Sequence, residues 1–190
     1  TPKPSSAASD VYKRQGYSEY DFQGVFQSVF TFATVELSSF YFDIRKDVLY
    51  CDGDTLERRS SRTVLDHLFL RLTSWLAPVL VFTMEEVWLE RYPSEDSSIH
   101  LTDMPSTPKT WINEELAAKW AIIRQARRAV TAALEVQRTN KVIGSSLEAS
   151  PVVYLEDQQT FDILNSIPFA DICITLSLIH ISEPTRRRGI

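Results

Sequence analysis

The sequence contains few of the residues on which several common classes of protein depend. Its 190 residues include only five glycines and two cysteines. So few glycines argue against a glycine-rich nucleotide-binding loop and against an all-β fold rich in turns. The two cysteines, Cys51 and Cys173, stand far apart and outside any CxxC pair, which predicts reduced thiols in a cytosolic protein rather than a disulfide framework.

Metal-ligand clusters and long apolar runs are also missing from the sequence. The three histidines, His67, His100 and His180, are isolated, so we expect no metal site in this chain. No apolar run approaches the roughly 20 residues that a membrane-spanning helix needs. The first residues lack the apolar centre of a signal peptide. The sequence therefore predicts a cytoplasmic protein with no membrane partner.

What is present suits a packed core. Apolar residues make up 44% of the chain and charged residues 24%, which fits one domain or one domain with a small appendage. The formal net charge is −5. An acidic balance argues against nucleic-acid binding over the whole surface but leaves room for a local basic stripe.

Both ends of the chain differ from its centre. Residues 1–15 show no helical or strand period, and residues 177–190 contain a proline and three consecutive arginines. The strings VYKRQ and SLIHISEPTR resemble translated sequencing-adaptor read-through, so we expect two non-native, disordered ends. A basic arm for nucleic acid is the competing interpretation of the arginine run. Between the two ends, residues 16–176 contain 14 basic and 23 acidic residues.

Four segments with apolar residues at three- and four-residue steps predict four long helices. They cover about residues 19–47, 55–76, 83–92 and 113–140. We expect the third to begin with a capping box, because Thr83 and Glu86 have the S/T-x-x-E form, and the fourth to begin at an N-cap, Asn113. Long helices with short connections fit a bundle around one apolar core. The proline-rich residues 93–112 are expected to form a surface loop.

The pattern changes after Gly144. Residues 151–155 are expected to form a strand, residues 158–167 a short helix and residues 171–175 a second strand. The predicted fold is therefore mainly α: a helical bundle over residues 16–144 followed by a truncated small α/β appendage over residues 145–176.

Two groups of basic residues are candidates for contact with phosphate. One lies on a single face of the fourth helix, opposite its apolar face, and the other lies at the start of the second helix. Arginine offers fork geometry to phosphate oxygens, whereas an ordinary solvated helix face is the alternative. The candidate residues are Arg58, Arg59, Arg62, Arg124, Arg127, Arg128, Arg138 and Lys141.

No grouping of residues predicts an active site. Asp66 and His67 are adjacent on a helix and therefore point in different directions, and Glu85–Glu86 is explained by helix capping. The segment Lys141–Ser145 is superficially like the KMSKS loop of synthetases but lacks its second lysine.

Three strings carry a family resemblance. They are LSSFYFDIRKDVLYCD at 37–52, RRSSRTVLDHLFLRLTSWLAPVLVFTMEEVWLERYP at 58–93, and NKVIGSSLEA at 140–149. Together they resemble, in family order over about residues 16–176, the anticodon-binding region of bacterial-type isoleucine–tRNA ligases. The second string is shared more loosely with valine and leucine synthetases, so the anticodon region of one of those enzymes is an alternative. A non-catalytic helical module that binds protein is another.

The resemblance implies a parent enzyme that uses ATP and Mg²⁺ to join isoleucine to its tRNA and clears mischarged valine in a separate editing domain. It implies that the catalytic and editing domains lie outside this chain, and that some members carry a zinc module further along. The segment itself would need no cofactor. It would grip the anticodon stem and loop of isoleucine tRNA, with the eight basic residues as contacts to the RNA backbone.

Overall fold

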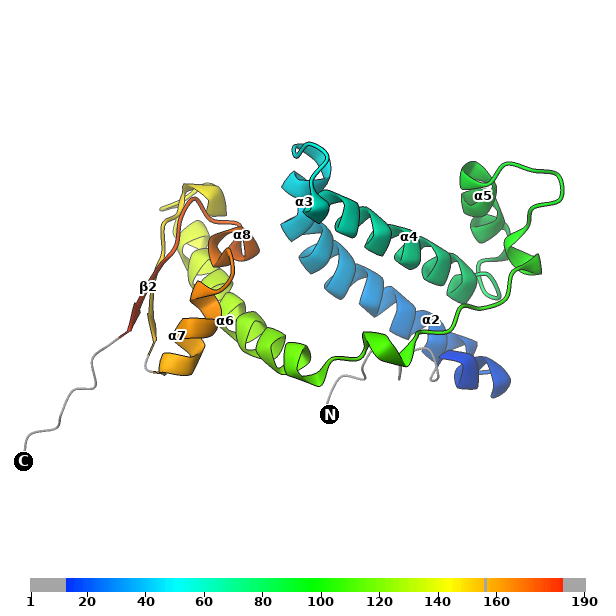
Figure 1. Cartoon of the computed structure of the whole chain (residues 1–190), viewed down its shortest axis with the longest axis horizontal. Helices are drawn as coiled ribbons and strands as arrows, with labels where there is room; N and C mark the ends of the chain where they lie inside the picture. Colours follow the sequence, from blue (N-terminus) through cyan, green and yellow to red (C-terminus); the bar gives the residue numbers. More distant parts are fainter. Residues whose placement is uncertain (1–12, 156, 183–190) are drawn as a thin grey trace, which may run out of the picture. The chain divides into compact units, whose positions relative to one another are not determined.

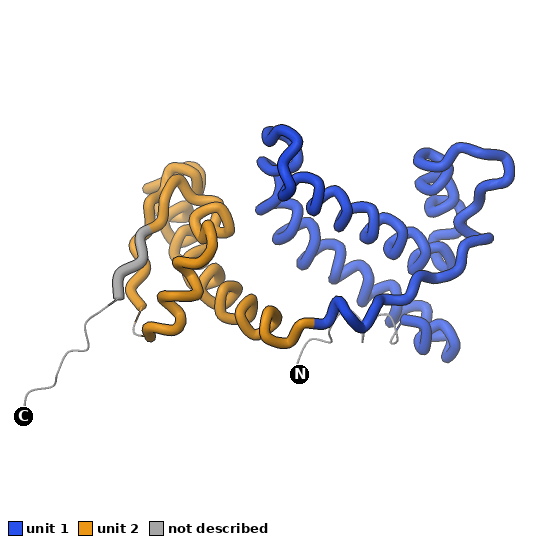
Figure 2. Tube along the Cα trace, viewed as in Figure 1, with its two compact units in different colours: residues 1–112 blue, residues 113–190 orange. Residues whose placement is uncertain are grey.

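The computed structural model describes residues 13–155 and 157–182 of the 190-residue chain. The chain forms two compact units that divide in sequence between Ile112 and Asn113 (Figure 2). Most of the described residues are helical (Figure 1). The prediction of a mainly α fold is therefore confirmed.

Unit 1 begins with one long helical stretch. After helical residues 13–18, α2 (Phe22–Thr31) continues into a π-helical segment, η1 (Phe32–Phe42), and then into α3 (Asp43–Tyr50). Asp21 caps α2, because its carboxylate accepts a hydrogen bond from the backbone N–H of Gly24 at 2.9 Å. The expected helix over residues 19–47 is thus confirmed.

The wider turns of η1 were not expected from the sequence. The hydroxyl of Ser39 donates to the carbonyl of Thr34, five residues earlier, at 2.9 Å. The hydroxyl of Thr34 donates in turn to the carbonyl of Phe30 at 2.8 Å. Side-chain hydroxyls that bond to the preceding turn compete with the regular helical ladder, which is consistent with its widening here.

The second and third helices are α4 (Leu56–Leu76) and α5 (Val81–Arg91). Thr55 caps α4 by accepting from the backbone N–H of Arg58 at 3.2 Å, which confirms the predicted start of that helix. The predicted capping box at Thr83 is wrong, because α5 begins two residues earlier with Leu80 as its N-cap.

The reason is the shortness of the turn after α4. The backbone N–H of Leu80 bonds to the carbonyl of Leu76 at 2.7 Å, and that of Met84 bonds to the carbonyl of Leu80 at 2.9 Å. The backbone hydrogen bonds of α5 have therefore already formed when the chain reaches Thr83. No free backbone N–H remains for the Thr83 hydroxyl to cap. An S/T-x-x-E string marks a helix start only where the preceding backbone leaves amides free.

The core of unit 1 lies between α2 and α4, which run alongside each other (Figure 1). Val25 and Val29 are fully buried against Trp75, which is 5% exposed. Phe32 meets the Trp75 ring edge to face, with 6.5 Å between ring centroids. A second small cluster joins Met84 of α5 to the surrounding turns. Residues of four helical segments are therefore held together by apolar burial.

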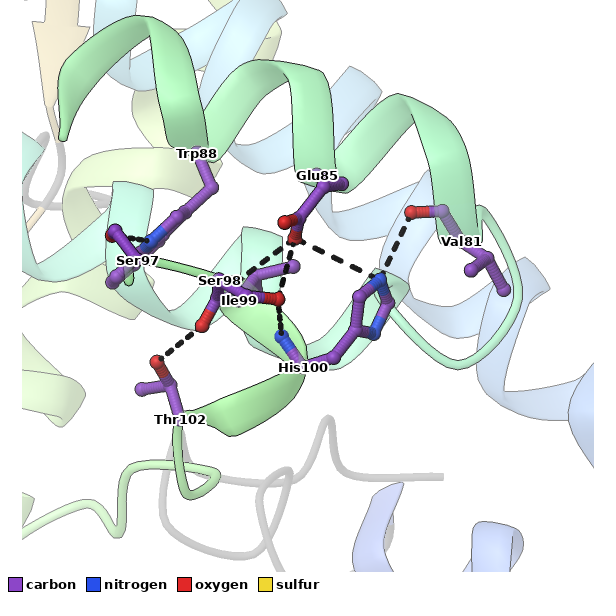
Figure 3. Close-up of polar contacts among 8 residues, drawn as sticks. All are labelled: Val81, Glu85, Trp88, Ser97, Ser98, Ile99, His100 and Thr102. Atoms are coloured by element: carbon purple, nitrogen blue, oxygen red, sulfur yellow. Dashed lines mark hydrogen bonds and ion pairs between the residues drawn. The ribbon is translucent and has the colours of Figure 1, made fainter. Parts of the chain in front are cut away.

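The connection after α5 is a loop, as predicted, but it is tied down by hydrogen bonds (Figure 3). The Glu85 carboxylate accepts from the Ser98 hydroxyl at 2.9 Å and from the backbone N–H of Ile99 at 3.1 Å. The Trp88 indole N–H donates to the Ser97 hydroxyl at 2.9 Å. Ile99 opens a short 3-10 turn, η2 (Ile99–Leu101), and its side chain is 2% exposed. Glu85 therefore anchors the loop instead of capping its own helix.

Unit 2 is built on α6 (Glu114–Thr139), which packs against α7 (Gln158–Asn165) and α8 (Phe169–Cys173). Asn113 caps α6 as predicted, because its side-chain oxygen accepts from the backbone N–H of Leu116 at 2.9 Å. Elements of unit 2 from α6 onward include η4 (Ser146–Glu148), β1 (Val152–Leu155) and β2 (Ile179–Ser182). The two strands pair in parallel, with Val152 opposite Ile179.

The second strand lies later in the chain than the sequence suggested. Residues 171–175 were expected to form it, but Phe169–Cys173 is the helix α8, which ends at Ile174 in the left-handed conformation with φ 56°. Short apolar runs fit a buried helix as well as a buried strand. Ile172 and Cys173 are buried within unit 2, so their apolar character reflects burial rather than strand pairing.

Two expectations about domain limits differ from the observed fold. The bundle was expected to reach residue 144, whereas the compact units divide before α6. Residues 13–15 are helical and residues 179–182 form β2, although both ends were expected to be disordered. Residues 1–12 and 183–190, with the arginine run, lie outside the described residues. The foreign origin of the ends stays a prediction.

Replacing Trp75 by alanine should destabilise unit 1 strongly. Truncating a buried tryptophan lowers the free energy of unfolding by about 3–5 kcal/mol, because the burial of the apolar ring is lost and a cavity remains. Urea denaturation followed by circular dichroism measures the change. Tyr50→Ala is the control: Tyr50 is 82% exposed, so its truncation should change the unfolding free energy by less than about 0.5 kcal/mol. Equal effects of the two substitutions would contradict this placement of the core.

Candidate nucleic-acid interface

The exposed basic face of α6 is the first candidate surface. We call Arg124, Arg128 and Arg138, which follow one another along this face, the α6 ridge. Arg128 is exposed, and its guanidinium has no hydrogen-bond or ion-pair partner among the described residues. The Arg138 guanidinium pairs with the Glu135 carboxylate three residues earlier at 2.9 Å, and both side chains are more than half exposed. Such exposed pairs stabilise a helix by well under 1 kcal/mol, so a phosphate can displace the carboxylate.

Arg127 has a structural contact that the helical projection did not reveal. Its Nε donates to the backbone carbonyl of Ile172 at 2.8 Å, and the residue is half-buried. The bond joins α6 to α8 within unit 2. The sequence grouped Arg127 with the ridge because Arg127 is next to Arg128 on the helix. A helix projection shows toward which side of the helix a side chain points, but it cannot show which other segment lies on that side.

The same contact region contains the buried thiol of Cys173. Burial raises the pKa of this thiol from 9.0 to about 12, and the nearby positive charge of Arg127 opposes the rise. A buried thiol with a raised pKa stays protonated at neutral pH and is a poor nucleophile. Cys173 is therefore part of the packing between α6 and α8 and has no reactive role.

The ridge is followed by a compact turn. Lys141 is exposed and adopts φ 57°, which takes the chain out of the helical conformation after α6. The backbone N–H of Gly144 donates to the Glu148 carboxylate at 2.9 Å, and Ser145 accepts from the backbone N–H of Leu147 at 3.3 Å. These local bonds fold the turn on itself and leave the Lys141 ammonium accessible at the end of the ridge.

The basic group on α4 is less available than the sequence suggested. Arg58 donates from Nη1 to the carbonyl of Asp52 at 2.8 Å, which ties the start of α4 to the preceding turn. Arg59 pairs with the Asp54 carboxylate at 3.0 Å. Arg62 is exposed, and its guanidinium has no hydrogen-bond or ion-pair partner within the described part of the chain. Arg62 is thus the residue of this group most available to an external anion.

The structure holds each basic group within its own unit. Arg58, Arg59 and Arg62 belong to unit 1, whereas Arg124, Arg127, Arg128, Arg138 and Lys141 belong to unit 2. Backbone contact with RNA stays a prediction for all eight. The exposed members with weak pairing or none are Arg59, Arg62, Arg128, Arg138 and Lys141.

The residues considered for catalysis have separate structural partners. Asp66 pairs with Arg91 of α5 at 2.6 Å, and the His67 ring lies 4.8 Å from the ring of Trp111. Within residues 13–155 and 157–182, no three metal-ligating side chains come together. None of the described helices is long and apolar enough to cross a membrane.

The sequence pattern also did not single out a buried arginine of α4. Arg71 of α4 is 8% exposed, and its guanidinium lies 4.9 Å from the Trp111 ring centroid. Its only signals in the sequence are its place one turn after His67 and the presence of a tryptophan in the distant loop. Neither signal predicts the contact, because the course of the loop is not visible in a helical period.

Comparison with known proteins identifies the class. The family model described as the anticodon-binding domain of tRNA ligase matches residues 12–153. The chain therefore belongs to the anticodon-binding domain family of tRNA ligases.

Isoleucine–tRNA ligases are among the similar proteins. The enzyme from Ruegeria pomeroyi is 62% identical over 178 residues, which cover 94% of this chain and 18% of that protein. The enzyme from Brucella abortus is 48% identical over 181 residues, covering 95% and 18% respectively. The enzyme from Agrobacterium fabrum is 49% identical over 175 residues, covering 92% and 18%. The chain thus spans less than a fifth of the length of these relatives.

Thiol labelling tests the packing of α8 on α6. At pH 8, iodoacetamide should modify the exposed Cys51 readily and leave Cys173 unmodified, because a pKa of about 12 leaves only about one thiolate in ten thousand. Raising the pH from 7 to 9 should still leave Cys173 unmodified, because its raised pKa keeps the thiol protonated. Mass spectrometry counts the adducts, and a urea-denatured sample should label at both positions. Equal rates at the two cysteines in the folded chain would contradict the burial of Cys173.

Proposed function

We propose that this chain holds the anticodon stem and loop of isoleucine tRNA as part of an isoleucine–tRNA ligase. The observation that carries the proposal is the α6 ridge, where the exposed Arg128 and Arg138 follow the part-buried Arg124 on a chain whose net charge is −5. Membership of the anticodon-binding family and the activity for which its relatives are named support the choice of RNA as the partner.

The spacing of the ridge suits a nucleic-acid backbone. Arg124 and Arg138 are 14 residues apart in sequence, which is about 21 Å along a helix at 1.5 Å per residue. A row of this length can reach more than one phosphate of a folded RNA strand. Guanidinium groups bind phosphate oxygens through paired N–H donors, so they fix the position of the RNA without reading its sequence.

The chemistry of the parent enzyme is also a proposal. We place ATP-dependent joining of isoleucine to tRNA, and the removal of mischarged valine, in parts of the parent that this chain does not contain. Editing is needed because one methylene group discriminates by only about 1–3 kcal/mol in an apolar pocket. We assign ATP, Mg²⁺ and any zinc ion to those parts as well. We place the enzyme in the cytoplasm.

The acidic balance of the chain supports one other candidate function, a helical module that binds a basic protein. It does not account for the exposed arginines that follow one another along α6. The valine and leucine enzymes remain candidates for the parent on sequence pattern, whereas the three relatives above are all isoleucine enzymes.

Charge reversal on the ridge tests the proposal. Arg128→Glu should weaken binding of isoleucine tRNA and reduce the slope of log K against log salt concentration by about 0.7–0.9 for each phosphate that the chain no longer neutralises. Filter binding over a series of salt concentrations measures both quantities. Lys46→Glu is the matched control, because it makes the same change of charge at an exposed residue of α3 outside the candidate set.

The control should bind as the unaltered chain does. If Arg128→Glu keeps the affinity and the salt slope of the unaltered chain, the ridge is an ordinary solvated surface. If both substitutions weaken binding equally, the effect is one of net charge and no phosphate contact is located at Arg128. Binding of a basic protein with no binding of tRNA would favour the protein-interaction module.

A further inference from the structure

A buried arginine joins α4 to the end of unit 1. The guanidinium of Arg71 donates from Nη2 to the carbonyl of Ser106 at 3.2 Å and from Nη1 to the carbonyl of His67 at 3.3 Å. It also lies 4.9 Å from the Trp111 ring, against which the His67 ring packs at 4.8 Å. We call these four residues the Arg71 clasp. It holds the loop after α5 at two points, Ser106 and Trp111.

Core packing alone does not explain this arginine. Arg71 is 8% exposed, its Nε is buried without an acceptor, and no carboxylate of the described residues pairs with it. Burying a guanidinium without a counter-charge is costly, and carbonyl oxygens and an aromatic face offset only part of that cost. An apolar side chain of similar volume would fill this position at a lower free-energy cost of burial. The specific gain from arginine is that one side chain reaches two separate parts of the loop.

The clasp acts at the point where the chain leaves unit 1. Trp111 ends the short 3-10 turn η3 (Lys109–Trp111), and its backbone N–H bonds to the carbonyl of Pro108 at 3.0 Å. Only Ile112 separates it from Asn113, the N-cap of α6. With the clasp closed, the free connection between the units is therefore very short. With the clasp open, the connection lengthens by the residues from Ser106 onward.

We propose that Arg71 is a positioning residue for tRNA binding, which shortens the connection so that Arg62 of α4 and the α6 ridge act on one RNA molecule. This inference rests on the proposed function. Two binding surfaces joined by a short connection reinforce each other, because the second contact forms at a high effective concentration. The effective concentration falls roughly as the −3/2 power of connection length, so an open clasp should weaken tRNA binding about tenfold.

The experiment uses the 190-residue chain and an isoleucine tRNA transcript. Arg71→Met keeps the apolar stem and removes the guanidinium. Arg91→Met is the matched control, because Arg91 is also an arginine stacked on an aromatic ring, 4.8 Å from that of Phe69, and lies outside the clasp. Both substitutions remove one positive charge, so any difference between them reports position rather than charge.

Arg71→Met should bind about tenfold more weakly than Arg91→Met while keeping the same salt slope, since neither residue is proposed to touch phosphate. Amide hydrogen exchange should show reduced protection at Trp111 in Arg71→Met only. Trp111→Leu is the second variant, because Trp111 is 48% exposed and its replacement leaves the core intact. It should reproduce the weaker binding even if Arg71→Met lowers the stability of unit 1.

The outcomes separate this inference from the function on which it rests. Equal tRNA affinity of Trp111→Leu and the unaltered chain, with both folded by circular dichroism, would show that the clasp has a structural role alone. A lower salt slope in Arg71→Met would overturn positioning in favour of direct phosphate contact. Failure of the unaltered chain to bind tRNA in a salt-dependent way would overturn the proposed function and this inference together.

Discussion

The burial of Trp75 between α2 and α4 is the contact on which the rest of unit 1 depends. Val25 and Val29 cover the indole from α2, and Phe32 of η1 meets its edge. The backbone carbonyl of Trp75 accepts a hydrogen bond from the Tyr17 hydroxyl, so the helical residues before α2 are attached at the same place. Apolar burial supplies most of the free energy of such a core. The helices fixed in this way provide the rigid surface to which the long loop is tied.

Polar contacts then determine the path of that loop. The Glu85 carboxylate accepts a hydrogen bond from the backbone N–H of Ile99 in the first half of the loop. The Arg71 guanidinium donates one to the carbonyl of Ser106 further along. Backbone groups paired in this way are satisfied without a regular strand or helix. The loop therefore ends at a defined place, directly before the residue that caps α6. We regard this ordered exit from unit 1 as the link between the fold and the binding of RNA.

The sequence predicted those features that depend on local chemistry. Thr55 and Asn113 cap their helices because a polar side chain precedes an apolar period in each case. The start of α5 could not be predicted, because it depends on the tight turn after α4. The helical conformation of Ile172 could not be predicted either, because a short buried apolar run fits a helix and a strand equally well. The candidate arginines could be found from helical spacing, whereas the separate use of Arg127 depends on a neighbour 45 residues away. Contacts of that kind come from tertiary structure alone.

The proposed function makes binding local. A net charge of −5 repels RNA in general, so under this proposal an exposed arginine such as Arg128 would supply attraction at a defined place. Competition by hairpin RNAs is the most direct test of binding to the anticodon arm. In this experiment, unlabelled hairpins compete with labelled isoleucine tRNA for the 190-residue chain. A hairpin of the anticodon stem and loop should displace the tRNA at nearly the concentration needed for the whole tRNA, and an acceptor-stem hairpin of equal length should not. Equal competition by the two hairpins would contradict the assignment of this chain to the anticodon arm.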